Sequence, residues 1–94
     1  MLTCKAMYKQ LDEAVHAEVL DFPGVITCGP NMDEARRLLA SALVDMAETC
    51  LQHGEPLPRP APARTDPEAD IEEPVYYWLK TASHVAWVAE EAAL

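Results

Sequence analysis

The chain has 94 residues, and its three cysteines and three histidines are the side chains best suited to nucleophilic or metal chemistry. A thiol nucleophile needs a histidine base within hydrogen-bonding reach and an electropositive pocket. Cys4 with His16 as its base is the pair that best fits adjacent predicted strands, and Cys28 is the other candidate thiol. A surface histidine on the polar face of a strand is the simpler interpretation of His16. We therefore expect no catalytic residues.

Metal ligands and phosphate-binding loops are also poorly represented. His16, His53 and His84 fall in different predicted elements, and no His, Cys and carboxylate residues have the spacing of a zinc site. Several carboxylates bracket the second predicted strand, but the first has none to complete a two-metal cluster. All three glycines are isolated, so we expect no phosphate loop, no metal and no cofactor. The bracketing carboxylates are Asp12, Glu13, Glu18 and Asp21.

The formal charge of −9 argues against direct binding of DNA or RNA. An acidic chain is better suited to a basic protein partner. The odd number of cysteines without close spacing favours a reducing compartment. We find no signal-peptide pattern and no apolar run of membrane-spanning length, so we expect one cytoplasmic domain with no membrane contact.

The first third of the chain is patterned as three short strands. Residues 2–9 and 14–20 alternate between apolar and polar positions, and residues 25–28 are β-branched and brief. Pro23 and Gly24 separate the last two of these strands, as in a tight turn. The pattern predicts a three-stranded antiparallel meander.

Residues 32–53 carry the clearest helix pattern. Asn31 precedes them as an N-cap, and Glu34 stands three residues later, as in a capping box. Gly54 follows the last turn as a stop signal. The predicted helix is long enough to cover one face of a small sheet. Its apolar stripe consists of Met32, Ala35, Leu38, Leu39, Ala42, Leu43, Met46 and Cys50.

A proline-rich stretch over residues 55–70 predicts an extended, solvated linker or arm. A PxxP ligand is the alternative interpretation. The segment after it has helical spacing from Pro74 but a strand-forming composition. We favour a strand at 84–89 that returns to the sheet, with 75–81 extended or a short helical turn. The expected fold class is α+β, in the order β-β-β-α-β.

One motif runs through Phe22, Pro23, Gly24, Gly29, Asn31, Glu34, Ala35 and Gly54. In this order and with these spacings, it resembles the motif of the HicB-like antitoxin family. The resemblance covers residues 2–60 and implies a truncated RNase H-like fold without nuclease activity. On this basis we divide the chain into a HicB-like core over 1–60, a proline-rich acidic arm over 61–73, and an aromatic segment over 74–94 that completes the sheet or a dimer.

The resemblance implies a non-catalytic antitoxin of a type II toxin–antitoxin system. Such a protein binds a small basic HicA-type toxin that cleaves mRNA, and blocks its active site. Many members also carry a C-terminal DNA-binding domain, which we do not expect here because the segment after the arm is short and acidic. An orphan HicB-like structural or regulatory binding module without a toxin is the alternative.

Partner binding is expected at a sheet edge and the C-terminal segment. Aromatic residues would be the apolar anchors, and acidic residues would form a rim that meets basic side chains. Burial of the aromatics in the chain's own core or in a homodimer is the competing interpretation. We expect a homodimer or higher oligomer, because a small sheet leaves an edge or face open. The anchors are Tyr76, Trp78 and Trp87, and the rim is Asp66, Glu68, Asp70, Glu72 and Glu73.

Overall fold

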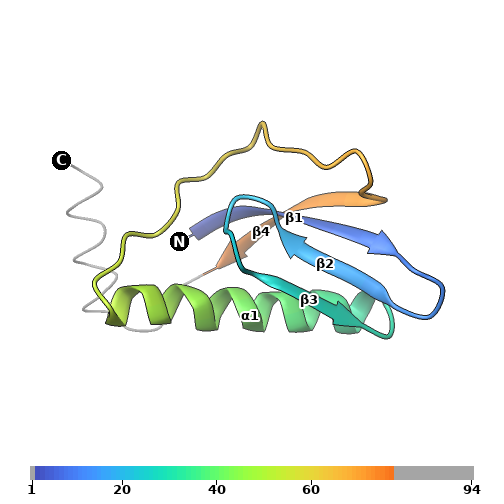
Figure 1. The fold of residues 1–94 in the computed structure, drawn as a ribbon, viewed down its shortest axis with the longest axis horizontal. Coiled ribbons are helices and arrows are strands. Elements are labelled where there is room, and N and C mark those ends of the chain that lie inside the picture. The colour runs from blue at the N-terminus through green and yellow to red at the C-terminus, as the bar shows by residue number, and fades with distance from the viewer. Residues whose placement is uncertain (1, 78–94) are drawn as a thin grey trace.

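Four strands and one helix make up residues 2–77, the part of the chain that this computed structural model describes. The strand order across the sheet is β3-β2-β1-β4, and all neighbouring strands are antiparallel. The predicted α+β fold, with a three-stranded meander, a long helix and one further strand, is confirmed (Figure 1). The elements are β1 (Leu2–Gln10), β2 (Val15–Val19), β3 (Ile26–Gly29), α1 (Met32–Gln52) and β4 (Ile71–Tyr77).

Helix α1 covers one face of the sheet (Figure 1). On β2, Val15, Ala17 and Val19 are buried, while His16 and Glu18 alternate with them on the other face. Residues four apart in a helix share one side, and that side of α1 is buried. Each fully buried leucine contributes about 1.5–3 kcal/mol relative to an exposed one. The buried helix residues are Ala35, Leu39, Leu43, Ala47 and Leu51.

A tight turn built on Phe22, Pro23 and Gly24 joins β2 to β3. The side chain of Phe22 is buried in the core, and its carbonyl accepts from the N–H of Val25 at 3.2 Å. Gly24 has a φ of +93°, a conformation that residues with a side chain rarely adopt. Proline followed by such a glycine matches the central positions of a type II turn. This turn therefore reverses the direction of the chain, so that β3 pairs antiparallel with β2.

Gly29 and Asn31 together set the start of α1. A Cβ atom on Gly29 would lie 2.7 Å from the backbone nitrogen of Ala35, so the strand and the first helical turn touch through backbone. Asn31 caps the helix, because its side-chain oxygen accepts from the N–H of Glu34 at 2.9 Å. The Glu34 carboxylate instead accepts from Arg37 at 2.6 Å. Of the two hydrogen bonds of a capping box, the structure therefore shows the one accepted by the Asn31 side chain.

The proline-rich arm lies over the face of the sheet opposite α1 (Figure 1). The sequence predicted a solvated linker or arm over residues 55–70, and residues 61–70 are exposed or half-buried. Hydrogen bonds to the sheet, which we did not predict, also hold this stretch in place. The Lys5 ammonium donates to the carbonyls of Pro62 at 2.7 Å and Arg64 at 2.8 Å. Met7, which shares this face with Lys5, is only 2% exposed. The molecule therefore has three layers: helix, sheet and arm.

The fourth strand is β4, and it begins at Ile71, inside the stretch 61–73 that we assigned to the arm. Its pairing with β1 places Val75 opposite Cys4 and Ile71 opposite Tyr8. Residues 75–77 are extended, as one of the two alternatives for that segment proposed. The strand predicted at 84–89 lies outside the described residues. No helix in the described part of the chain is both long and apolar enough to cross a membrane.

Candidate partner-binding surface

The edge formed by β4 is the open edge that carries predicted binding residues. Lys5 of β1 lies opposite Pro74 of β4. The backbone of Lys5 is bonded on the side away from β4, because its N–H donates to Asp21 and its carbonyl accepts from Leu20, both at 2.9 Å. In an antiparallel ladder, the backbone groups of Pro74 then point away from β1. Proline at an outward position costs no ladder hydrogen bond but leaves the edge short of a donor. The outward positions are Glu72, Pro74 and Tyr76.

Tyr76 is the predicted anchor that the structure exposes. Its side chain is 61% exposed, the largest fraction among the large hydrophobic residues of the described chain. It lies opposite Thr3 near the start of β1 and shares a sheet face with Pro74. A large exposed ring on an open edge is a typical feature of a binding surface. Trp78 and Trp87, the other two predicted anchors, lie outside the described residues.

The predicted acidic rim takes part in the fold as well as in the surface. Glu73 lies on the helix side of β4 and accepts from the Arg36 guanidinium at 2.9 Å. Glu72, on the arm side, accepts from Thr65 at 2.5 Å and forms an ion pair with Lys5 at 3.4 Å. Asp70 accepts from the backbone N–H of Gln10 at 2.6 Å. These carboxylates hold β4 and the arm in place, a role that we did not predict.

A small cluster around Tyr8 joins α1 to β4. The Arg36 guanidinium lies over the Tyr8 ring, 5.6 Å from its centroid, and the Tyr8 hydroxyl hydrogen-bonds to Glu73. Burial, together with Glu73, raises the pKa of Tyr8 to about 12. Burial opposes ionisation of Glu73, but its bonds to Arg36 and Tyr8 outweigh burial and lower its pKa. Tyr8 therefore stays a neutral donor and Glu73 a charged acceptor.

Asp21 has a structural role that the sequence analysis did not predict. It was weighed there only as one of four carboxylates that bracket the second strand, and just 5% of it is exposed. One carboxylate oxygen accepts from the N–H of Lys5, and the other accepts from the N–H of Ala61 at 3.0 Å. The sequence does hold a sign of this burial, since Asp21 directly precedes the buried Phe22 and a tight turn. Asp21 therefore anchors the arm to the sheet.

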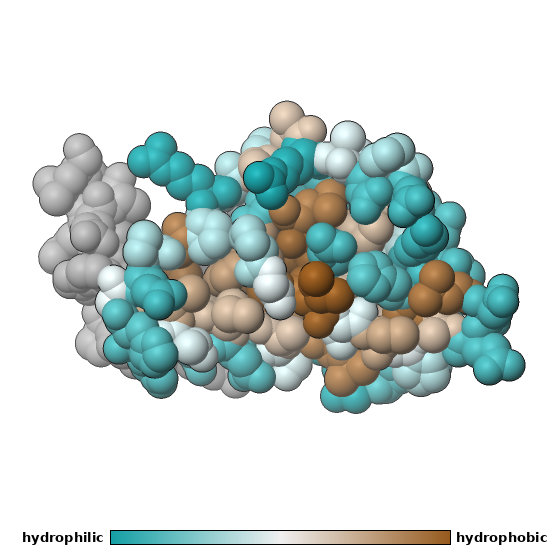
Figure 2. Space-filling model, in the orientation of Figure 1, coloured by the Kyte–Doolittle hydropathy of each residue, from teal (hydrophilic) through white to brown (hydrophobic). Residues whose placement is uncertain are grey.

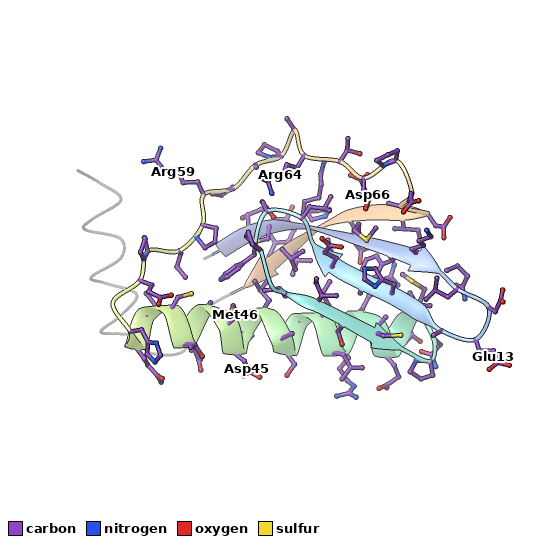
Figure 3. All side chains as sticks on the ribbon, viewed as in Figure 1. Glu13, Asp45, Met46, Arg59, Arg64 and Asp66 are labelled. Carbon is purple, nitrogen blue, oxygen red and sulfur yellow. The ribbon has the colours of Figure 1, made fainter. Side chains whose placement is uncertain are left out.

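An open hollow of about 250 Å³ lies beside the β4 edge, between the sheet and the arm. Thr3 and Cys4 of β1, Pro74 of β4, and Pro60 and Pro62 of the arm contribute to its walls. The proline rings make the hollow mainly apolar. Figure 3 shows the arm that forms its outer wall, with Arg64 and Asp66 above the sheet and Met46 on the helix below.

The structure separates one of the two thiols weighed for catalysis from His16 and places the other beside it. Cys28 lies opposite His16 in the β2–β3 ladder and faces the same side of the sheet. Cys4 faces the helix side with Ala6 and Tyr8, whereas His16 faces the arm side, so the Cys4–His16 hypothesis is wrong. Burial and the nearby charge of Asp21 raise the pKa of Cys4 to about 11, which keeps it a thiol. Among residues 2–77, no group of histidine, cysteine and carboxylate side chains could hold a metal ion.

Comparison with known proteins finds similarity among solved structures. No family profile and no curated protein matches the chain. Among solved structures, the chain is similar to the crystal structure of the N-terminal domain of the Burkholderia pseudomallei antitoxin HicB. The TM-score is 0.66 at 24% sequence identity, over 83% of this chain and 100% of that one. The chain has the fold of this HicB domain.

The HicB-like fold agrees with the resemblance found in the sequence. The turn at Phe22, Pro23 and Gly24, the close approach at Gly29 and the cap at Asn31 are the local features that build it. The match spans all of the solved HicB domain, so the whole of that domain has a counterpart in this chain.

Proposed function

We propose that this chain is a HicB-like antitoxin of a type II toxin–antitoxin system. It binds a small basic HicA-type toxin that cleaves mRNA, covers the active site of that toxin, and acts in the cytoplasm without catalysis of its own. The observation that carries the proposal is the similarity in fold to the whole N-terminal domain of an antitoxin. The sequence motif and the acidic charge support it independently.

The distribution of charge supports a basic partner. The chain has 16 acidic and 7 basic residues, and the structure pairs much of the positive charge internally. Lys5, Lys9, Arg36 and Arg37 each form an ion pair with a glutamate. The excess negative charge is therefore available to a partner, and complementary charge accelerates association and selects a basic surface.

The surface proposed for toxin binding is the β4 edge with the C-terminal segment. Tyr76 supplies an exposed aromatic anchor on that edge, and the neighbouring hollow accepts an apolar side chain of the toxin. Asp70, Glu72 and Glu73 fix the position of this edge and place negative charge around it. The aromatic anchors proposed beyond Tyr76 are Trp78 and Trp87.

Co-expression with the small basic protein encoded by the adjacent gene tests the proposal. We expect the wild-type chain to rescue growth and to co-purify with that protein. Tyr76→Ala should weaken binding by roughly tenfold or more, because hot-spot aromatics carry most of the energy of an interface. Leu11→Ala is the matched control, since Leu11 is 43% exposed and directly follows Gln10, at the other end of β1.

Two results would count against the proposal. If the adjacent gene encodes no basic protein and a pull-down recovers none, the chain is an orphan HicB-like structural or regulatory binding module. If Tyr76→Ala and Leu11→Ala bind equally well, the toxin is held by another surface.

A further inference from the structure

Within residues 2–77, the second edge of the sheet that is left unpaired is β3, and it differs sharply from β4. The N–H of Val19 donates to the carbonyl of Val25 at 2.9 Å, so Val25 is bonded toward β2. Along β3, residues bonded toward β2 alternate with residues whose backbone groups point away from β2. Val25 and Thr27, which lies opposite Ala17, belong to the first kind. The N–H and carbonyl groups of Ile26 and Cys28 therefore lie along this edge.

The β3 edge lacks the features that usually protect an edge strand. Its four residues, Ile26–Gly29, include no proline and no charged side chain. The β4 edge, by contrast, carries Glu72, Glu73 and Pro74. Charged residues and proline on an edge strand are the common means of preventing strand pairing between molecules. The fold therefore blocks intermolecular pairing at β4 and leaves it open at β3.

Apolar side chains border the β3 edge. Ile26 is 54% exposed, and Cys28 is exposed two residues later on the same face. Helix spacing places Leu38 and Ala42 on the flank of α1 beneath β3, the flank from which Met46 reaches Gly24. Figure 2 shows hydrophobic surface over β3 and the helix beneath it. A strand added at this edge would bury much of that surface.

We propose that β3 pairs antiparallel with β3 of a second copy of this chain, so that two sheets join into one. Thr27 then lies on the two-fold axis, and Ile26 lies opposite the partner's Cys28. This register uses every outward backbone group of Ile26 and Cys28 in both copies. A register shifted by two residues toward the helix brings in Pro30, which has no N–H to donate.

A second copy suits this edge better than a charged partner does. The side chains of β3 are all neutral, so self-pairing places no like charges opposite one another across the ladder. A basic partner strand would find no carboxylate within β3. The proposed dimer also leaves the β4 edge free, so it is independent of toxin binding and can fail without affecting the proposed function.

Disulfide trapping tests the register directly. In this pairing the two Thr27 residues form a non-hydrogen-bonded pair, whose Cβ atoms come within about 4.5–5.5 Å, close to disulfide reach. The two Cys28 residues are offset along the strands and exceed the roughly 7 Å limit between Cα atoms. We expect Thr27→Cys in a Cys28→Ser background to cross-link on mild oxidation. Neither Cys28→Ser alone nor the wild type should do so.

Sedimentation supplies a second readout that does not depend on cysteine chemistry. We expect the wild-type chain to be a dimer, Ile26→Lys to be a monomer with an unchanged circular dichroism spectrum, and the control Tyr76→Lys to remain a dimer. A monomeric wild type overturns the proposal, as does an Ile26→Lys variant that folds and still dimerises. If Ile26→Lys does not fold, the cross-linking result decides, and absence of a Thr27→Cys dimer overturns the proposal.

Discussion

At the scale of single residues, a buried carboxylate in an acidic chain organises one face of the sheet. Asp21 holds β1 with one oxygen and the arm with the other. Burying a charged group is costly unless each of its oxygens finds a donor, and here backbone N–H groups supply both. Asp21 therefore explains why a proline-rich arm stays on the sheet.

Removing the Asp21 carboxylate should destabilise the protein and release the arm. Asp21→Ala leaves the N–H groups of Lys5 and Ala61 without their acceptor, a loss of roughly 1–3 kcal/mol for each buried donor left unpaired. We expect a lower midpoint in urea denaturation and faster proteolysis within residues 61–70. Asp12→Ala, in the exposed β1–β2 turn, is the control and should change neither. Equal effects of the two variants would show that Asp21 is not an anchor.

The cluster of Arg36, Tyr8 and Glu73 predicts how stability depends on pH. Burial alone would raise the pKa of Glu73, but Arg36 and Tyr8 lower it below its ordinary value of 4.5. A carboxyl group with a depressed pKa in the folded state stabilises the protein above the unfolded pKa. That contribution disappears as pH falls through the folded pKa.

Comparison of the wild type with Glu73→Gln at several pH values measures this contribution. The difference in free energy of unfolding should be largest above about pH 5 and should shrink as the pH falls below the ordinary Glu pKa of 4.5. Glu68→Gln is the control, because its side chain is 72% exposed in its ion pair with Lys9. A difference that stays constant from pH 7 to about pH 3 would contradict the assignment.

At the scale of elements, the junction between β3 and α1 depends on a backbone contact. Gly29 touches the first turn of the helix so closely that a Cβ atom would lie 2.7 Å from the nitrogen and 2.9 Å from the Cα of Ala35. Backbone atoms cannot rotate away as a flexible side chain can. The position therefore requires glycine for space, and its backbone angles play no part in this requirement.

Gly29→Ala should move the start of α1 away from the sheet. Overpacking of this kind typically costs about 1–3 kcal/mol. We expect a lower melting temperature by calorimetry, with loss of order at the first turn of the helix. Ala40→Ser, at an exposed position of α1, is a control of similar size change and should cost only a few tenths of a kcal/mol. A Gly29→Ala variant as stable as this control would contradict the packing argument.

The elements that local patterns predict are those whose side chains repeat with a clear period. β2 and α1 were predicted within a residue or two, because alternation on β2 and the stripe on α1 are local properties. The position of β4 was missed, since Glu72, Glu73 and Pro74 are poor strand formers and only pairing with β1 makes them extended. Contacts of the arm are equally non-local: Asp21 and Ala61 are 40 residues apart.

The candidate site was predictable in part for the same reason. Tyr76 is exposed, and its role as an anchor stays a prediction. The roles of Glu72 and Glu73 were not predictable, because their partners Lys5 and Arg36 come from distant parts of the chain. Charge totals predict a kind of partner, whereas only the fold shows which acidic groups are already paired.

At the scale of the whole molecule, the two edges of one small sheet are suited to different partners. The β4 edge carries an exposed aromatic ring, an adjacent apolar hollow and nearby negative charge. The β3 edge carries an uncharged strand with open backbone groups. The proposed toxin surface and the proposed dimer edge therefore lie on opposite sides of the sheet and do not overlap. The net charge of −9 would attract a basic partner over long distances.

The most direct test of this account is a titration of RNA cleavage by the toxin with this chain. The proposed toxin is a small basic protein encoded by an adjacent gene, and it is purified alone and supplied with single-stranded RNA. We predict that cleavage stops at stoichiometric amounts of the chain, and that the inhibition weakens as salt screens the charges. Cleavage that continues at a large molar excess of the chain would contradict the account.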